Sequence, residues 1–378
     1  MTVRILQGDV FARLAELPDE SVHCVVTSPP YWGLRSYGGL AGEIGREPTL
    51  DGHIDVLVRV FREVRRVLRP DGTCWINYGD RYVCSPGNGK GGGSTLAGPG
   101  HHSGRSSFSS GLKPKDLMLL PARLALALQE DGWWVRSEII WAKPNPMPES
   151  ATDRPTSAHE KIYLLTKSAR YFYDAKAVQT AQAVESLARQ DRAMKGYAPP
   201  EQTAHNGLMA PHKNKRHQAI PTGWDTDGGA HGTIHLNGRT PRSDKQRGHS
   251  RRHAGFNGRW DAMSKSEQQA NGANIRNVWT IPVYGFPGPH FATFPPALVE
   301  PCIKAGCPER GTVLDPFGGS GTVGLVADRL GRDAILIELN ESYVKMARAR
   351  ITNDAPLFSP VQSPQEGEET TLWVRRTE

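Results

Sequence analysis

Short apolar segments and amphipathic segments alternate over the first 82 residues of the chain. Val3–Leu6 and Val22–Thr27 are runs of apolar positions that predict buried strands. Between Ile54 and Leu68 apolar side chains recur at the spacing of one helix face, which predicts a long helix. The sequence Arg69-Pro70-Asp71-Gly72 then indicates a turn before a strand at Thr73–Tyr78. Strands that alternate with helices predict a mostly parallel sheet.

The same alternation returns in two later stretches of the chain, so we expect one α/β fold. In order, the expected elements are a helix at 114–130, strands at Trp133–Ala142 and Lys161–Thr166, a helix at Pro296–Ala305, a strand at Val313–Asp315, a helix at Val323–Leu330, a strand at Ala334–Glu338 and a helix at Ser342–Arg350.

Three segments interrupt this pattern. Residues 85–112 are rich in Gly and Ser, which predicts a mobile loop. Aliphatic periodicity disappears over 176–276, which indicates an insert, and the Pro- and Glu-rich residues 355–378 predict a disordered tail. The α/β fold is therefore expected to consist of 1–175 and 277–354.

The positive charge of the chain is concentrated in the insert. Residues 176–267 hold 15 Lys and Arg against 8 Asp and Glu, a balance of +7 that equals the net charge of the whole chain. A cationic segment in an otherwise balanced protein predicts a polyanionic partner, and nucleic acid is the first candidate.

The five cysteines are odd in number and widely spaced, so they indicate no disulfide framework. The N-terminal residues are expected to form a strand and not a signal peptide, and the chain has no apolar run long enough to cross a membrane. These features predict a cytoplasmic protein with no membrane partner.

A glycine turn follows the expected strand that ends at Asp315, in the sequence Asp315-Pro316-Phe317-Gly318-Gly319. The next strand ends in an acid, Glu338, which could accept both hydroxyls of a ribose. The turn lacks the G-x-G-x-x-G spacing of dinucleotide sites, and Asp315 would repel a pyrophosphate. It suits an adenosine cofactor that carries an amino group, such as S-adenosylmethionine. A plain tight turn in a sheet is the alternative.

A second loop, Thr27-Ser28-Pro29-Pro30-Tyr31-Trp32, follows another expected strand. Proline stiffens the backbone and supplies no N–H donor. The Ser28 hydroxyl and the Pro29 carbonyl could accept hydrogen bonds from the amino group of a planar ring, while Tyr31 stacks on its face. A rigid turn with a packed tyrosine is the alternative.

Ser28-Pro29-Pro30-Tyr31 resembles the catalytic motif of exocyclic-amino DNA methyltransferases, which methylate cytosine N4 or adenine N6. Asp315–Thr322 resembles their cofactor motif, and His290–Pro295 resembles the segment that precedes it. Trp141–Ser150 and His159-Glu160 resemble further blocks of the family. The catalytic motif comes before the cofactor motif, as in the circularly permuted beta group. The resemblance covers residues 3–83, 113–174 and 278–350.

The resemblance implies a Rossmann-like, circularly permuted sheet that binds S-adenosylmethionine. Residues 1–175 would be its catalytic half, 277–354 its cofactor-binding half, and 176–276 an inserted target-recognition region. The implied catalytic residues are Ser28, Pro29, Pro30 and Tyr31. Asp9 would meet the adenine amino group, Glu338 would hold the ribose, and the remaining implied cofactor residues are Phe291, Thr293, Phe294, Asp315, Phe317, Gly319, Ser320, Gly321 and Thr322.

Double-stranded DNA is the implied partner, with the target base flipped out to reach the site. A separate cognate restriction endonuclease would be a further partner. The expected phosphate contacts are Lys143, Lys213, Lys215, Arg216, Arg251 and Arg252, each of which could instead be a solvated surface charge.

The family resemblance leaves the target base open. Serine in the first position of the motif is more usual for cytosine-N4 enzymes, so we favour cytosine N4 over adenine N6. The other candidates are RNA or protein-glutamine methylation, and a DNA-binding protein without catalysis.

Two further chemistries have little support in the sequence. Pro301-Cys302 could supply the nucleophile of a cytosine-C5 enzyme, but it lies within an expected helix. The pairs His231/His235 and His249/His253 have a zinc-like spacing, but no Cys-x-x-Cys accompanies them, so we expect no metal site.

Overall fold

The computed structural model describes residues 1–33, 40, 42–83, 109–180, 272–283 and 294–354. The chain divides into one compact unit of residues 1–178 and 275–378 and a second of 179–274. In the second unit the described residues include Thr180 and Ala273, which pair as an isolated antiparallel bridge. The first unit carries the fold described below.

An eight-stranded sheet forms the centre of the first unit, in the order β1-β8-β7-β2-β3-β5-β4-β6. The strands from β1 to β3 in this order are mutually parallel, while β5 is antiparallel to both β3 and β4. Their bounds are β1 Val3–Gln7, β2 Val22–Thr27, β3 Leu68–Tyr78, β4 Trp134–Ala142, β5 His159–Thr166, β6 Val278–Thr280, β7 Thr312–Asp315 and β8 Asp333–Glu338.

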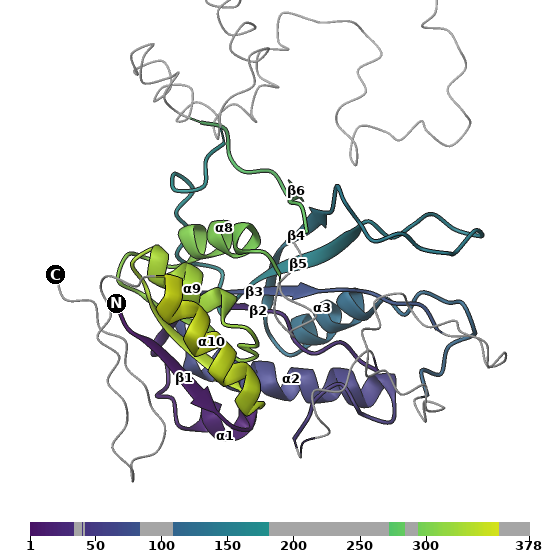
Figure 1. Ribbon diagram of the computed structural model, residues 1–378, viewed down its shortest axis with the longest axis horizontal. Helices are drawn as coiled ribbons and strands as arrows, with labels where there is room; N and C mark the ends of the chain where they lie inside the picture. The colour runs from purple at the N-terminus through teal and green to yellow at the C-terminus, as the bar shows by residue number, and fades with distance from the viewer. Residues whose placement is uncertain (34–39, 41, 84–108, 181–271, 284–293, 355–378) are drawn as a thin grey trace, which may run out of the picture. The chain divides into compact units, whose positions relative to one another are not determined.

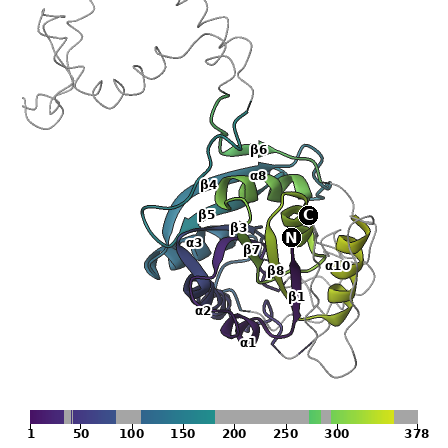
Figure 2. The same cartoon turned by 90° about the vertical axis from the view of Figure 1, so that its left-hand side faces the viewer.

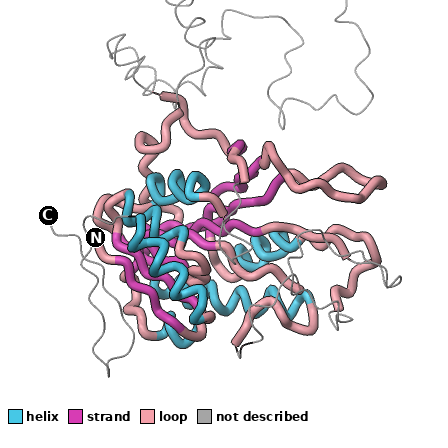
Figure 3. Tube along the Cα trace, viewed as in Figure 1, coloured by secondary structure: helices cyan, strands magenta, loops and turns pink. Residues whose placement is uncertain are grey.

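Helices cover both faces of the sheet, each over its own apolar core (Figures 1 and 2). The helices α1 Val10–Ala15, α2 Leu50–Val67 and α3 Leu120–Glu130 supply one core, which contains Phe61 and Leu128. The helices α8 Pro296–Gly306, α9 Thr322–Arg329 and α10 Glu341–Asp354 supply the other, which contains Ile303 and Val326. Figure 3 shows the strands enclosed between these two sets of helices.

The predicted mostly parallel α/β sheet is confirmed, and β2 has the predicted bounds. The predicted turn at 69–72 lies inside β3: Val22 pairs with Leu68 and Cys24 with Thr73, so the intervening residues of β3 bulge out of register. The helix expected at 114–130 begins only at Leu120, because Lys115 and Leu119 have left-handed φ values of 70° and 55°. The three-residue strand β6 was not predicted.

We expect Gly306→Ala to destabilise this unit, because α8 approaches β3 closely at this glycine. A Cβ there would overlap Thr73 Oγ1 and would stand 2.6 Å from Trp75 Nε1. Overpacking of this kind costs about 1–3 kcal/mol of unfolding free energy. Thermal unfolding followed by circular dichroism checks the prediction, with Lys304→Ala, on an exposed part of the same helix, as the control that should change stability little. Equal melting temperatures for Gly306→Ala and the wild type would contradict it.

Candidate active site

The candidate site begins where β7 and β2 lie side by side at the centre of the sheet. From β7 the chain continues to β8 on one side, and from β2 it continues to β3 on the other. Such a topological switch point opens a crevice at the carboxyl ends of the strands, where α/β proteins bind ligands. The last residues of the two strands meet there: Thr27 Oγ1 donates a 2.7 Å hydrogen bond to Asp315 Oδ1.

Asp315 is a buried carboxylate with an exposed fraction of 1%. Its Oδ1 also accepts a 3.0 Å hydrogen bond from the backbone N–H of Phe317. Burial raises the pKa of Asp315 to about 7, although the hydrogen bonds from Thr27 and Phe317 act in the opposite direction. The negative charge of this side chain is therefore poorly compensated by the protein.

Glu338 stands at the end of β8, next to the glycine turn that follows Asp315. One of its oxygens accepts from the Gly319 N–H at 2.8 Å and the other from the Asn340 N–H at 2.8 Å. Burial raises the pKa of Glu338 above its ordinary value. In the part of the chain that the structure describes, no basic side chain forms a salt bridge with Asp315 or Glu338. One buried and one half-buried carboxylate without such a basic partner fit a cationic ligand, and S-adenosylmethionine carries a sulfonium and an ammonium group.

The glycine turn is tightly packed against the strands and helices around it. Gly319 and Gly321 have positive φ values of 49° and 79°, a backbone region that favours glycine. Any Cβ at Gly321 would stand 2.8 Å from the Cβ of Ala347 on α10. Ser320 and Thr322 are buried, and both side-chain oxygens accept hydrogen bonds from Arg350, at 3.0 and 2.8 Å. These two hydroxyls therefore hold α10 against the turn.

The implied adenine contact, Asp9, lies at the end of β1 and caps helix α1. Its Oδ1 accepts from the N–H groups of Phe11 and Ala12 at 3.0 and 3.1 Å. A Cβ built on Gly42 would stand 2.8 Å from the other oxygen, Oδ2, so Gly42 itself lies against this carboxylate. The cap fixes the direction of the side chain, with one oxygen directed away from the helix.

Tyr31 of the Ser28–Tyr31 loop is held on both its ring and its hydroxyl. Its ring contacts Tyr78 edge-to-face, with ring centroids 5.1 Å apart, and a Cβ at Gly79 would stand 2.6 Å from the Tyr31 ring. Its hydroxyl donates to Glu160 Oε2 at 2.9 Å. Burial and the neighbouring Glu160 carboxylate raise the pKa of Tyr31, while a hydrogen bond with the Ser28 side chain acts to lower it.

Glu160 belongs to one of the family blocks, but the sequence predicted no role for it. Asn77 was not predicted to be a site residue. Glu160 forms an ion pair with Lys143 through Oε1, and Asn77 Nδ2 donates to Glu160 Oε2 at 2.9 Å. Lys143 Nζ also lies 4.5 Å from the centre of the Trp141 ring. The ammonium group of Lys143 is thus paired with Glu160 inside the candidate site. The expected contact between Lys143 and a DNA phosphate stays a prediction.

A second set of hydrogen-bonded side chains holds Tyr78, against which the Tyr31 ring packs. The sequence did not predict this set either. His53 is fully buried on α2, with Nδ1 2.8 Å from Glu47 Oε2 and Nε2 2.7 Å from the Tyr78 hydroxyl. Burial acts to raise the pKa of Glu47, but hydrogen bonds from His53 and the Gly45 N–H hold it below its ordinary value. The sequence feature that could have indicated this role is that His53 stands next to the apolar face of a predicted amphipathic helix.

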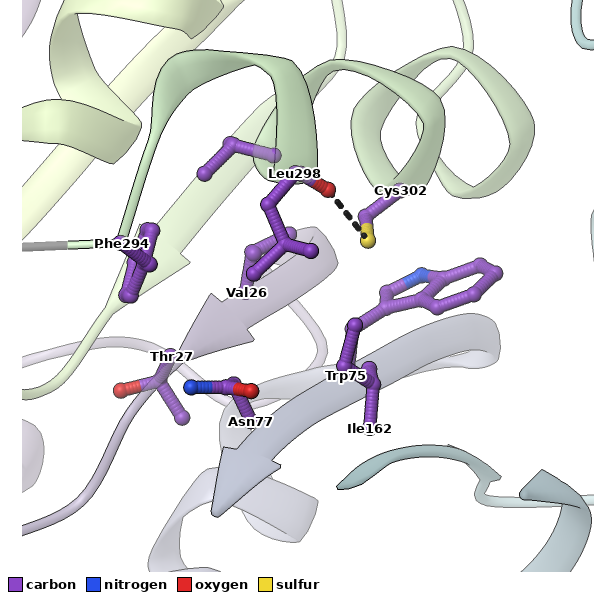
Figure 4. A pocket seen from close by; sticks show the side chains of 9 residues that line it. Val26, Thr27, Trp75, Asn77, Ile162, Phe294, Leu298 and Cys302 are labelled. Carbon is purple, nitrogen blue, oxygen red and sulfur yellow. Dashed lines mark hydrogen bonds between the residues drawn. The ribbon is translucent and has the colours of Figure 1, made fainter. Parts of the chain in front are cut away.

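A small apolar pocket lies between the sheet and α8 (Figure 4). Its lining residues are Val26, Thr27, Trp75, Asn77, Ile162, Phe294, Leu298, Val299 and Cys302. Phe294, an implied cofactor residue, therefore lies close to Thr27. The Cys302 thiol donates to the Leu298 carbonyl at 3.3 Å within the helix, and burial raises its pKa, which is the environment of an inert structural thiol.

Several expected site residues lie outside the described residues. These are Phe291, Thr293, Lys213, Lys215, Arg216, Arg251 and Arg252, together with His231, His235, His249 and His253. The described ranges hold no group of three or more His, Cys, Asp or Glu that could bind a metal ion. Nor do they contain a helix that is both long and apolar enough to span a membrane.

Comparison with known proteins establishes the family. A sequence model described as DNA methylase, of the N6/N4 methyltransferases, matches residues 22–349. The type II methyltransferase M.Cfr9I of Citrobacter freundii is 37% identical, over 93% of this chain and 88% of its own length. The type II methyltransferase M.SmaI of Serratia marcescens is 36% identical, over 92% of this chain and 90% of its own length. The chain belongs to the N6/N4 DNA methylase family.

A solved structure agrees on the fold. The PvuII DNA methyltransferase, described as cytosine-N4-specific, superposes with a TM-score of 0.51 at 17% identity, covering 94% of this chain and 92% of that one. The family membership confirms the expected Rossmann-like methyltransferase sheet and S-adenosylmethionine as the cofactor. The protein is a DNA methyltransferase of the family whose members act on exocyclic amines.

The buried carboxylate predicts that Asp315→Asn stabilises the apo protein at alkaline pH. Both hydrogen bonds end on Oδ1, so the amide oxygen of asparagine can accept them while the charge is removed. Because the pKa is raised from 3.8 to about 7, the folded wild type binds a proton over this range that the unfolded chain has released. Its stability therefore falls as pH rises from about 4 to 7, by about 4 kcal/mol in all.

Urea unfolding of Asp315→Asn and wild type at several pH values checks this prediction. The variant should be more stable at pH 8, and the difference should shrink toward pH 4. Asp153→Asn, at an exposed ion pair with Lys115, is the matched control and should leave the slope in this pH window unchanged. A variant that is less stable than wild type at pH 8 would show that the carboxylate is well compensated after all.

Proposed function

We propose that the protein transfers a methyl group from S-adenosylmethionine to N4 of a flipped-out cytosine in double-stranded DNA. The observation that carries the proposal is the bond between Thr27 and Asp315. Thr27 is followed directly by Ser28, the first residue of the proposed catalytic motif. Asp315 is the buried acid of the proposed cofactor motif, so the two motifs lie next to each other. The amine acceptor and the cation-binding carboxylate thus share one crevice.

The cofactor supplies an electrophilic methyl group on a sulfonium. Asp315 would hold the ammonium of its methionine part together with Phe317, Gly319 and the 291–295 segment. Glu338 would hold the ribose, and Asp9 would hold the adenine. Ser320, Gly321 and Thr322 would shape the turn around it. This assignment is supported by the buried Asp315 and half-buried Glu338 carboxylates at neighbouring strand ends, whose raised pKa values favour a positively charged ligand.

The catalytic task is to align a weakly nucleophilic amine with the methyl group. Ser28 Oγ and the Pro29 carbonyl would accept the two amine protons, which favours a pyramidal nitrogen and stabilises its growing positive charge. Pro30 stiffens the loop, and the ring of Tyr31 would contact the flipped base. The edge-to-face packing of Tyr31 on Tyr78 supports this role, because it fixes the ring before the base arrives.

The basic insert at 176–276 would read the DNA, and the Gly/Ser-rich segment 85–112 would close over the base or the duplex. The charge balance of the insert supports this role, because its residues 176–267 carry +7 and a segment of this charge is drawn to phosphates. The relatives M.Cfr9I and M.SmaI are named type II methyltransferases, which supports a place in a restriction-modification pair with a separate endonuclease.

Mass spectrometry of nucleosides tests the reaction. Purified protein incubated with unmethylated DNA and S-adenosylmethionine should yield N4-methylcytosine. Ser28→Ala should reduce the rate about 100-fold, since it removes one preorganised contact to the developing charge. Ser137→Ala on β4, whose hydroxyl makes only a 3.5 Å contact to a neighbouring carbonyl, is the control and should keep full activity. N6-methyladenine would overturn the base assignment, and methylation of RNA alone would overturn the substrate.

Cofactor binding should depend on pH through Asp315. At pH 6 the free protein holds this carboxyl largely protonated, so binding of an ammonium group has to release the proton. We expect the Kd for S-adenosylmethionine to rise up to about tenfold for each pH unit below 7. Isothermal titration in two buffers of different ionisation enthalpy measures the released proton. Asp315→Asn should bind S-adenosylmethionine more weakly, with a Kd that does not change over this pH range. If the Kd of the variant still depends on pH, the titrating group is not Asp315.

A further inference from the structure

His53 is a buried polar side chain of α2, and both of its ring nitrogens are hydrogen-bonded. Its exposed fraction is 0%. Nδ1 lies 2.8 Å from Glu47 Oε2, and Nε2 lies 2.7 Å from the Tyr78 hydroxyl oxygen. An ionised carboxylate only accepts hydrogen bonds, so Nδ1 carries a proton and donates it to Glu47. In the neutral ring Nε2 is then the acceptor, and the Tyr78 hydroxyl donates to it.

The carboxylate that orients the His53 ring is itself held in place. Its two oxygens accept from the backbone N–H of Gly45, at 3.1 and 3.0 Å. The backbone carbonyl of the same residue, Glu47, accepts from the indole N–H of Trp32 at 2.9 Å. The segment that orients His53 is therefore tied to the residue that directly follows Tyr31.

Tyr78, the last residue of β3, connects His53 to the ring of Tyr31. The Tyr78 hydroxyl is at the far end of the side chain, so its hydrogen bond to His53 keeps the ring from swinging out of position. The Tyr31 and Tyr78 rings lie at 85° to each other with centroids 5.1 Å apart, a T-shaped arrangement that aromatic pairs prefer. Tyr78 is fully buried, whereas Tyr31 is half-buried, so part of the Tyr31 ring stays accessible.

The backbone after Tyr78 also contacts the ring of Tyr31. A Cβ built on Gly79 would stand 2.6 Å from Tyr31 Cε2 and 3.1 Å from its Cζ. The ring thus packs against two consecutive residues at the end of β3, and its place depends on where Tyr78 stands. A ring that receives the target base has to be placed accurately, because a misplacement of about 1 Å near a reacting centre can cost about 100-fold in rate.

We propose that His53 is a positioning residue, which acts through Tyr78 to hold the ring of Tyr31 where the flipped base arrives. The inference rests on the proposed function, in which Tyr31 contacts that base. Each step from Glu47 to His53, from His53 to Tyr78 and from Tyr78 to Tyr31 is a direct contact. Because His53 is fully buried, its effect reaches the base only through these neighbours. The rate of methyl transfer should therefore depend on His53, and cofactor binding should not.

Two variants of His53 separate its two hydrogen bonds. The amide of asparagine is as many bonds from the backbone as Nδ1, and the amide of glutamine is as many bonds away as Nε2. His53→Asn therefore keeps the bond to Glu47 and loses the bond to Tyr78, and His53→Gln does the reverse. We expect the single-turnover rate of methyl transfer to fall about tenfold in His53→Asn and to stay near wild type in His53→Gln, with an unchanged Kd for S-adenosylmethionine in both. A His53→Gln variant as slow as His53→Asn would overturn the proposal.

Tyr78→Phe removes the hydroxyl but keeps the ring, so it decides the question if the His53 variants do not fold. It should also lower the rate about tenfold. In a Tyr31→Ala background no ring remains to be positioned, so adding Tyr78→Phe should cause no further loss of rate. Losses that multiply would show a purely structural role and overturn the proposal. Asp55→Asn, at an exposed position of α2, is the control and should keep the wild-type rate.

The outcomes separate the two proposals. Wild type that methylates no cytosine overturns the proposed function itself, and Tyr31→Ala with full activity overturns the base contact on which the role of His53 rests. Cytosine methylation that depends on Tyr31 but is unaffected by Tyr78→Phe overturns only the role of His53.

Discussion

The arrangement of the site depends on a buried negative charge at the centre of the sheet. Asp315 ends β7, Thr27 ends β2, and their hydrogen bond joins residues 288 positions apart in the chain. Neither hydrogen bond to Asp315 Oδ1 compensates its burial fully, as the raised pKa of about 7 shows. Folding therefore leaves an unfavourable charge at the centre of the sheet, and under the proposed assignment the apo protein gives up stability that a cationic cofactor would restore on binding.

The catalytic loop, in contrast, is supported by polar groups that are well paired. Glu160, Asn77 and Lys143 hold the hydroxyl of Tyr31, while Glu47 and His53 hold Tyr78, on whose edge the Tyr31 ring packs. Asn77 Oδ1 is buried without a hydrogen-bond partner among the described residues, but the hydrogen bonds that the network does form rigidify the groups they hold. The candidate site thus combines a half with a poorly compensated charge, which is the proposed cofactor side, with a hydrogen-bonded half around Tyr31, which is the proposed base side.

The sequence was sufficient for the sheet, the two motif loops and the family, because each depends on local features such as an apolar run followed by Gly or Pro. It was insufficient where a contact depends on strand register. Asn77 and Glu160 meet only because β3 and β5 pair with Asn77 opposite Ile162, and no local pattern fixes that alignment. Backbone conformation was a second obstacle: the left-handed Leu119 delays α3, although helical periodicity starts earlier. β6 has three residues and forms against β4 alone, so its own sequence carries little signal.

The strand order also has a consequence during synthesis on the ribosome. β1 and β2 are consecutive in the chain, but β8 and β7 lie between them in the sheet. At about 5–20 residues per second, β7 leaves the ribosome about 15 to 60 s after β2. Until then one edge of β2 has no parallel neighbour from this sheet, and β1 stays without its single neighbour until β8 follows. Unpaired strand edges are prone to aggregation. The strand order therefore leaves the N-terminal part of the chain, which carries the Ser28–Tyr31 loop, with unpaired strand edges for most of its synthesis.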